Sequence, residues 1–129
     1  VLAVAGAGSF YHRMRRAEAL AGQLWTYEES SWLPHGTARD GSPEDQPVWL
    51  AADDTNPTSN PNGAQFLFLT DGATSDGVGD FERCFELFDG GDADAVEAAR
   101  GRWKTYKDEG HDLTYWRQDA GGRWEKKDV

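Results

Sequence analysis

The run that most restricts the fold is residues 65–70 (Gln-Phe-Leu-Phe-Leu-Thr), the most hydrophobic stretch of the 129-residue chain. Its four middle residues are apolar without interruption, so a strand built from them has no polar face to turn toward water. Such continuity is typical of a central strand covered on both faces, as in α/β sheets. Further strands are predicted at residues 1–5 and 47–52. A short one at 113–116 is followed by a turn and return over 119–124.

Three segments carry apolar residues at helical spacing, which predicts three helices. They are residues 13–25, residues 80–89 and residues 92–109. The second prediction rests on i, i+3, i+4, i+7 spacing, with a cap at Asp80 and an end at Gly90-Gly91; the residues so spaced are Phe81, Cys84, Phe85 and Phe88. In the third, Asp92 is expected to be the N-cap and Gly110 the C′ residue. The order of elements predicts a single α/β domain over residues 1–129, with three layers and a mainly parallel or mixed sheet.

The formal net charge of −10 is distributed unevenly. Residues 28–97 hold sixteen acids against Arg39 and Arg83, and the polar segments 37–46, 53–63 and 71–80 read as surface loops. A chain with this much negative charge repels DNA phosphates, which argues against broad nucleic-acid binding. We expect a soluble cytoplasmic protein, because no run has the length of a membrane span, no secretory signal is present and Cys84 cannot form an internal disulfide.

The residues that catalysis or metal binding would need are scattered. His12, His35 and His111 show no metal-ligand spacing, and Cys84 lies on an apolar stripe where an inert packed thiol is the expectation. We therefore expect neither a metal nor a cofactor and no enzymatic activity. The alternative is a small nucleotide-binding α/β protein or enzyme that uses the Gly6-x-Gly8 turn after the first strand. The third glycine of that fingerprint is replaced by Tyr11, which weakens this interpretation.

The end of the last predicted helix combines aromatic and basic residues. Val96, Ala99, Trp103 and Tyr106 share one apolar arc, and three cations form a stripe beside Trp103; they are Arg100, Lys104 and Lys107. A peptide carboxylate next to an apolar side chain would suit this surface. An ordinary amphipathic helix with solvated cations, which favour the helix C-terminus, would produce the same pattern.

A second unusual segment is Trp32-Leu33-Pro34-His35-Gly36. Pro34 holds Leu33 away from helical geometry. Two large apolar residues in such a segment either enter the core or are displayed to a partner. For His35 a structural role is favoured over a catalytic one, because no serine, cysteine or carboxylate stands beside it as a triad motif.

The chain also resembles a known family in the order and spacing of several short segments. These are 24–27 (LWTY), 31–36 (SWLPHG), 60–63 (NPNG), 81–84 (FERC), 88–90 (FDG), 100–107 (RGRWKTYK) and 110–113 (GHDL), with Trp116. Together they cover about residues 20–127 and are similar to the chi subunit of bacterial DNA polymerase III.

The resemblance implies a Rossmann-like fold without enzymatic activity and a role as an accessory protein of the clamp loader. It implies two partners and only indirect contact with DNA. One partner is the C-terminal tail of single-stranded-DNA-binding protein, which is acidic and ends in a hydrophobic residue with a free carboxylate. By correspondence this tail would bind at Arg100, Trp103, Lys104, Lys107 and Trp25. The other partner, the psi subunit, would dock at Trp32, Leu33, Pro34 and His35.

The first twenty residues depart from the family pattern. The family usually begins with a methionine, a first strand and a helix before its second strand. Here residues 1–5 resemble the second strand, whereas Phe10, Tyr11 and His12 resemble the end of the first. We expect one strand–helix unit of the family to be either missing from this chain or unrecorded in this sequence.

Overall fold

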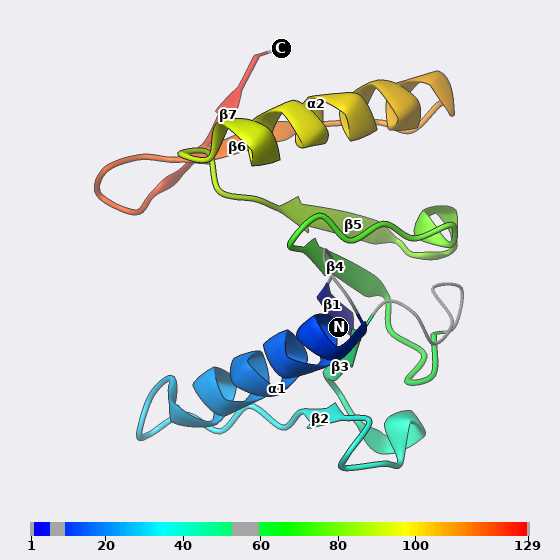
Figure 1. The fold of residues 1–129 in the computed structure, drawn as a ribbon, viewed down its shortest axis with the longest axis vertical. Helices are drawn as coiled ribbons and strands as arrows, with labels where there is room; N and C mark the ends of the chain where they lie inside the picture. Colours follow the sequence, from blue (N-terminus) through cyan, green and yellow to red (C-terminus); the bar gives the residue numbers. More distant parts are fainter. Residues whose placement is uncertain (1, 6–9, 53–59, 129) are drawn as a thin grey trace. The chain divides into compact units, whose positions relative to one another are not determined.

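A computed structural model describes residues 2–5, 10–52 and 60–128, with side chains from residue 15 onward. The chain divides into two compact units, residues 1–89 and residues 90–129 (Figure 1). The Gly6-x-Gly8 turn and most of the predicted loop at 53–63 lie outside the described residues.

The first unit is built on one parallel sheet. Its elements are β1 (Leu2–Ala5), α1 (Phe10–Thr26), β2 (Gly36–Thr37), β3 (Trp49–Ala52), β4 (Phe66–Thr70) and β5 (Arg83–Leu87), with short 3-10 helices at Pro43–Asp45 and Val78–Asp80. The strand order is β2-β3-β1-β4-β5, and every adjacent pair in it is parallel. The α/β class and the mainly parallel sheet are thus confirmed. The three-layer Rossmann-like arrangement and the single domain over residues 1–129 stay predictions.

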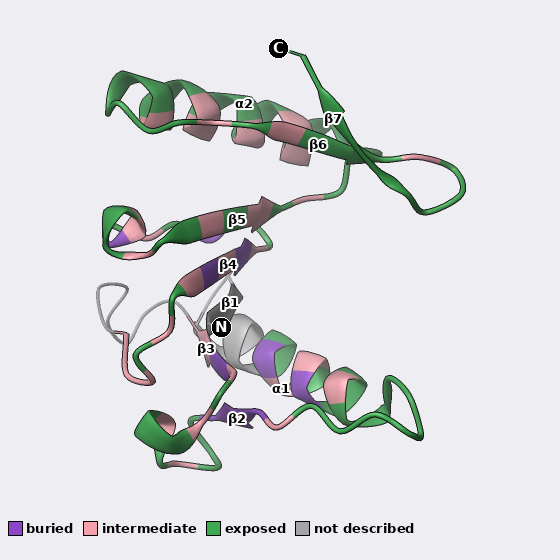
Figure 2. Cartoon of the chain, turned by 180° about the vertical axis from the view of Figure 1, so that it is seen from behind, coloured by how far each residue is buried: buried purple, intermediate pink, exposed green. Residues whose placement is uncertain are grey.

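Strand β4 has neighbours on both sides, as the hydrophobic run predicts. Leu67 and Leu69 are fully buried and alternate with Phe66 and Phe68, which are half-buried. The buried leucines join the core cluster of the unit, which consists of Trp49, Leu67, Leu69 and Ala73. Figure 2 shows the buried residues concentrated in β2, β3, β4 and along α1.

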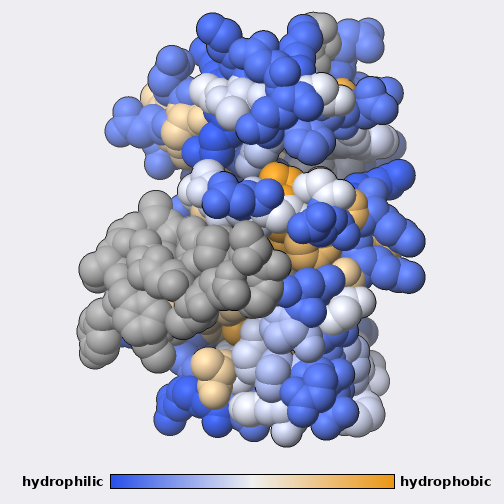
Figure 3. All heavy atoms as spheres, turned by 90° about the vertical axis from the view of Figure 1, so that its right-hand side faces the viewer, coloured by the Kyte–Doolittle hydropathy of each residue, from blue (hydrophilic) through white to orange (hydrophobic). Residues whose placement is uncertain are grey.

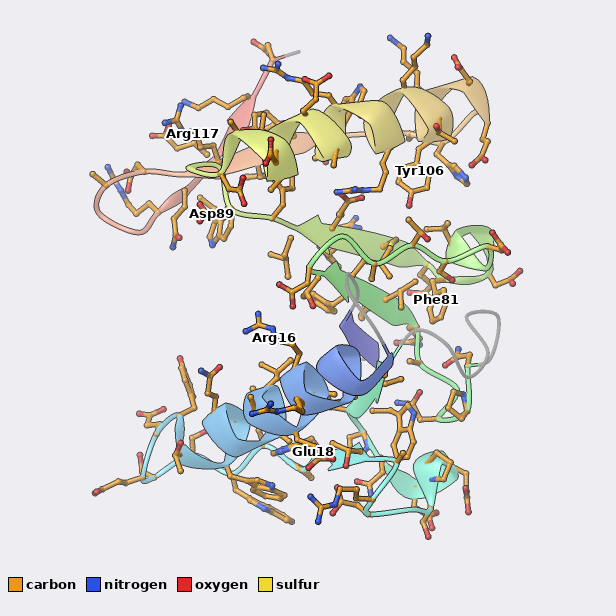
Figure 4. All side chains as sticks on the ribbon, viewed as in Figure 1. Arg16, Glu18, Phe81, Asp89, Tyr106 and Arg117 are labelled. Carbon is orange, nitrogen blue, oxygen red and sulfur yellow. The ribbon has the colours of Figure 1, made fainter. Side chains whose placement is uncertain are left out.

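Helix α1 packs on the sheet through small residues. Ala17 and Ala21 are buried one turn apart, and the helix contacts β3 and β1. Arg16, labelled in Figure 4, reaches the turn after β4, where its Nη2 lies 3.0 Å and its Nε 3.2 Å from Asp71 Oδ2. Asp71 has a positive φ of 54°, and this forked ion pair secures the turn in that conformation.

The predicted helix over residues 80–89 is wrong, because this segment forms β5 instead. Its backbone pairs in parallel with β4 over five positions, from Phe66↔Arg83 to Thr70↔Leu87. Cys84 and Phe85 therefore point to opposite faces of the sheet. Cys84 packs against the core cluster, whereas Phe85 stacks on Phe68 with 4.6 Å between ring centroids. Pairing with a neighbouring strand outweighs the local helical spacing.

The second unit contains α2 (Ala93–Asp108) and an antiparallel hairpin of β6 (Tyr115–Gln118) and β7 (Trp124–Lys127). The predicted N-cap is confirmed, since the side chain of Asp92 accepts hydrogen bonds from the backbone of Asp94 and Ala95. No described residue of this unit is fully buried, and the corresponding part of Figure 3 is mostly hydrophilic with smaller apolar patches.

Helix α2 ends as the sequence predicts, in a Schellman motif. Gly110 has a φ of 88°, its backbone N–H donates to Lys107 O, and that of His111 donates to Tyr106 O. The rings of Tyr106 and His111 meet edge to face with 6.0 Å between centroids, which adds a side-chain contact across the motif.

Candidate partner-binding surfaces

The first candidate surface lies where α1 ends and the chain turns back toward β2. Four large apolar side chains are exposed there, and we call them the aromatic surface: Trp25, Tyr27, Trp32 and Leu33. Trp32 is 78% exposed and Leu33 39%, so of the two placements that the sequence left open, both residues take the exposed one. Pro34 is half-buried at the inner side of the segment. Exposed aromatic residues gathered in one place are characteristic of binding hot spots.

His35 is buried and lies in contact with residues of this surface. It is 4% exposed, its Nδ1 lies 2.8 Å from Leu33 O, and its Nε2 lies 3.0 Å from Ala21 O on α1. The indole of Trp25 covers the imidazole, with 4.1 Å between ring centroids. A buried ring with carbonyl groups at both nitrogens has the structural role that the sequence favoured, and it connects the last turns of α1 to the returning segment.

The second candidate surface is the basic stripe on α2, formed by Arg100, Lys104 and Lys107. All three side chains are exposed, and the four residues of the neighbouring apolar arc are half-buried; these are Val96, Ala99, Trp103 and Tyr106. The helix therefore covers its predicted apolar arc in part and leaves the basic stripe open to solvent. Figure 4 labels Tyr106 on this helix.

The cations of the stripe differ in their surroundings. Arg100 Nη1 lies 3.8 Å from Glu97 Oε2, but both side chains are largely exposed, so this pair contributes little. Within the described part of the chain, Lys104 and Lys107 form no ion pair. The stripe therefore presents two lysines beside Trp103 that are available to an external anion.

Trp25 and the basic stripe belong to different units of the chain. The sequence grouped Trp25 with the tail-binding residues, and the structure describes it beside His35 in the first unit. Trp25 thus contacts a residue of the predicted psi-docking segment. No pattern in the sequence indicates this contact, because it depends on how the chain returns after α1.

Other chemistry is limited in the part of the chain that the structure describes. There, no group of three or more His, Cys, Asp or Glu residues could hold a metal ion. Burial, with a smaller effect from Glu86, raises the pKa of Cys84 to about 11, which disfavours the reactive thiolate. Among the same residues, no helix has the length and apolarity to span a bilayer.

The hairpin of the second unit holds two exposed aromatic residues that belong to neither predicted site. Trp116 is 51% exposed and Trp124 is 56% exposed. The two tryptophans lie on opposite strands, and only the register of the hairpin shows how they are placed relative to each other. In this register Trp116 pairs with Lys126 and Gln118 pairs with Trp124. The available signal was two tryptophans among basic residues in a predicted turn and return.

Comparison with known proteins identifies the family. The family model described as "DNA polymerase III chi subunit, HolC" matches residues 10–114, which is most of the chain. A curated relative from Rickettsia prowazekii (strain Madrid E), named probable DNA polymerase III subunit chi, is 34% identical over 56 residues. That alignment covers 43% of this chain and about a third, 32%, of the relative. Because the family model matches most of the chain, the chain belongs to the DNA polymerase III chi subunit family.

Proposed function

We propose that this protein is a non-catalytic adaptor of the replisome that acts in the cytoplasm. It would link the psi subunit of the clamp loader to the acidic C-terminal tail of single-stranded-DNA-binding protein, and it would contact DNA at these two surfaces only indirectly. Membership of the chi family supports the replisome role. Two candidate surfaces of different chemistry, one aromatic and one basic, suit a protein with two different partners.

The observation that carries the proposal is the basic stripe beside Trp103. Lys104 and Lys107 are exposed, and each can donate to a carboxylate that approaches α2 from outside. Trp103 is half-buried next to them and offers a ring for an apolar end group. A tail that ends in a hydrophobic residue with a free carboxylate matches both features. The rest of the chain is acidic, which would help to reject long polyanions.

The aromatic surface supports the second contact. Trp32 and Leu33 would enter the psi interface, and Pro34 would hold them in an extended segment. Because His35 is buried, its contribution would be to position this segment and Trp25. Trp25 thus has support in the structure for a part in psi docking, whereas its predicted part in tail binding rests on the family correspondence alone.

Calorimetric titration with an acidic peptide that ends in phenylalanine tests the tail site. We expect the free-acid peptide to bind and Lys104→Glu to weaken binding by about 1–3 kcal/mol, the scale of a charged hydrogen bond. Added salt should also weaken binding, because the site is exposed. Amidation of the terminal carboxylate should weaken it without any change in the protein.

Arg83→Glu is the matched control, since it changes the net charge equally at an exposed position on β5. If Lys104→Glu and Arg83→Glu reduce affinity by the same amount, the effect is one of overall charge and the tail site is wrong. The tail site would also be wrong if wild type and Lys104→Glu bound the free-acid and the amidated peptide with equal affinity.

Co-purification tests the psi contact separately. The chain and psi are co-expressed, and Trp32→Ala combined with Leu33→Ala is expected to abolish the complex while tail-peptide binding is unchanged. Retention of the psi complex by this double variant would refute docking at the aromatic surface and leave the tail site unaffected.

A further inference from the structure

One face of the β6–β7 hairpin carries both exposed tryptophans. In an antiparallel pair, residues directly opposite each other share a face. Trp116 lies opposite Lys126 and Gln118 lies opposite Trp124, so these four residues form one surface, which we call the indole face. The two tryptophans are diagonal neighbours, a relationship that corresponds to about 7–8 Å between Cα atoms. Two flat rings thus lie on one ribbon with a lysine across from one of them.

None of the four residues of the indole face is a carboxylate, and Asp128 follows β7 two positions beyond Lys126. The hairpin has four bases against two acids; they are Arg117, Arg123, Lys126 and Lys127 against Asp119 and Glu125. Glu125 lies on the opposite face, where its Oε2 is 2.8 Å from Lys127 Nζ. Asp119 lies in the turn, with its Oδ2 3.3 Å from Arg123 Nε. Lys126 forms no ion pair with any described residue, so the four residues of the indole face include one cation that is available to a phosphate.

Local hydrogen bonds hold the hairpin in shape without a buried core. Asp119 Oδ1 accepts from the backbone N–H groups of Gly121 and Arg123, at 2.8 Å and 2.9 Å. Gln118 Nε2 donates to Gly122 O at 2.8 Å, and Trp116 Nε1 donates to Thr114 Oγ1 at 3.3 Å. These contacts restrict the strand ends and the orientation of one indole, which lowers the entropic cost of binding a ligand.

We propose that the indole face binds a short stretch of single-stranded nucleic acid. Bases would stack on Trp116 and Trp124, and a backbone phosphate would meet Lys126. Aromatic platforms with cations between them serve this purpose in proteins that bind single strands without sequence preference. With two rings and one cation on the face, the site spans only a few nucleotides, which is compatible with the overall negative charge.

The observations favour a nucleic acid over a peptide. A peptide that adds a strand would use the edge of β6 or β7 and leave the indole face open. A tail with one terminal apolar residue would occupy one ring, whereas alternating bases and phosphates can use both rings and the lysine. The hairpin lies beyond residues 10–114, so this inference does not depend on the family match or on the proposed function.

Fluorescence anisotropy of a labelled eight-nucleotide oligothymidylate tests the proposal with the full chain at low ionic strength. Trp116→Ala and Trp124→Ala should each weaken binding about fivefold or more, the effect of losing one stacked base. Lys126→Ala should reduce the slope of log affinity against log salt by about 0.7, the value for one phosphate of a single strand. Lys127→Ala, on the opposite face and paired with Glu125, is the matched control and should leave that slope unchanged.

Several results would overturn the proposal. These are no binding by wild type, binding by both tryptophan variants as tight as that of wild type, or equally tight binding by wild type of a duplex of the same length, whose bases cannot stack on the indoles. Circular dichroism of each variant establishes that the hairpin change has not unfolded the chain. The acidic phenylalanine-terminated peptide is titrated in parallel. If the tryptophan variants lose peptide binding instead, the face is a peptide site and the nucleic-acid assignment is wrong.

Discussion

The indole of Trp25 lies against the imidazole of His35, with 4.1 Å between the ring centroids and 39° between their planes. The buried histidine also reaches Ala21 O on α1 and Leu33 O on the returning segment. The imidazole thus contacts two residues of the aromatic surface, Trp25 and Leu33, and also Ala21 of α1. The stability of this surface and its ability to bind should therefore respond to different residues.

Substitution of His35 should reduce stability, whereas substitution of Trp32 should not. His35→Ala leaves a buried cavity and removes the imidazole as hydrogen-bonding partner of a backbone carbonyl, so we expect the free energy of unfolding to fall by about 1–3 kcal/mol. Trp32→Ala removes an exposed side chain and should change it by no more than about 0.5 kcal/mol. Urea unfolding of both variants measures the difference. Equal losses would mean that Trp32 contributes to the fold more than its exposure indicates.

Cys84 should be unreactive in the folded protein. Its pKa is raised from 9.0 to about 11, so very little thiolate exists at pH 8. We expect slow reaction with a disulfide reagent in buffer and rapid reaction in denaturing urea. Fast labelling of the native chain would contradict the packed position described for this thiol.

The same shift predicts how stability depends on alkaline pH. The pKa of Cys84 is higher in the folded state than in the unfolded state. The stabilisation that comes from keeping this thiol protonated is therefore complete below pH 9 and is lost as the pH rises through about 11. The stability of wild type should therefore fall more steeply across this window than that of Cys84→Ala, as measured by denaturant unfolding at several pH values. Parallel curves for the two proteins would be inconsistent with a raised pKa.

Two glycines of the second unit should respond in opposite directions to the same substitution. Gly101 is inside α2, and a Cβ added there meets nothing within 4 Å, so Gly101→Ala should stabilise the helix by about 0.5–1 kcal/mol. Gly110 has a φ of 88°, and Gly110→Ala should destabilise the helix end by about 1–2 kcal/mol. Thermal unfolding followed by helical circular dichroism distinguishes them. Shifts of the same sign would contradict the described C-terminus of α2.

Asp119 should control the hairpin turn. Hydrogen bonding from the backbone of Arg123 is the largest of the effects that lower its pKa. Because the folded-state pKa is lower than the unfolded one, the stabilising effect is present above the ordinary value of 3.8 and is lost as pH falls through the folded-state pKa. Asp119→Ala should remove hydrogen-exchange protection in β6 and β7 at neutral pH.

Glu125→Gln is the control for this turn, since it affects the contact with Lys127 and leaves the Asp119 hydrogen bonds in place. Equal loss of protection in both variants would show that the ladder rather than the turn sets the stability of the hairpin.

Local signals were enough to predict α2. A cap at Asp92, apolar residues at helical spacing and a glycine at position 110 act within a few residues of one another, and both ends of the helix agree with the prediction. Strand β5 was missed for the opposite reason. Phe81, Cys84, Phe85 and Phe88 fit a helix by spacing, but the segment's backbone hydrogen bonds are made to β4, which is distant in sequence. Such pairing is not encoded in the segment itself.

The candidate surfaces likewise divide into one that local spacing predicts and others that depend on contacts between distant segments. The basic stripe could be predicted because one helical period places Arg100, Lys104 and Lys107 together. The contact between Trp25 and His35 requires the chain to reverse after α1, and the indole face requires the register of two strands. Neither follows from spacing along one element.

The position of β1 has a consequence for the order in which the chain folds. This strand comes first in the sequence, yet it lies at the middle of the sheet, where Leu2 pairs with both Trp49 and Leu67. The sheet forms only when β1 pairs with β3 and β4, which are both far from it in the sequence. Such long-range pairings fold slowly. The hairpin, whose strands are separated by one short turn, can form in microseconds. We therefore expect the two ends of the chain to acquire their structure on different timescales, with the hairpin first and the parallel sheet last.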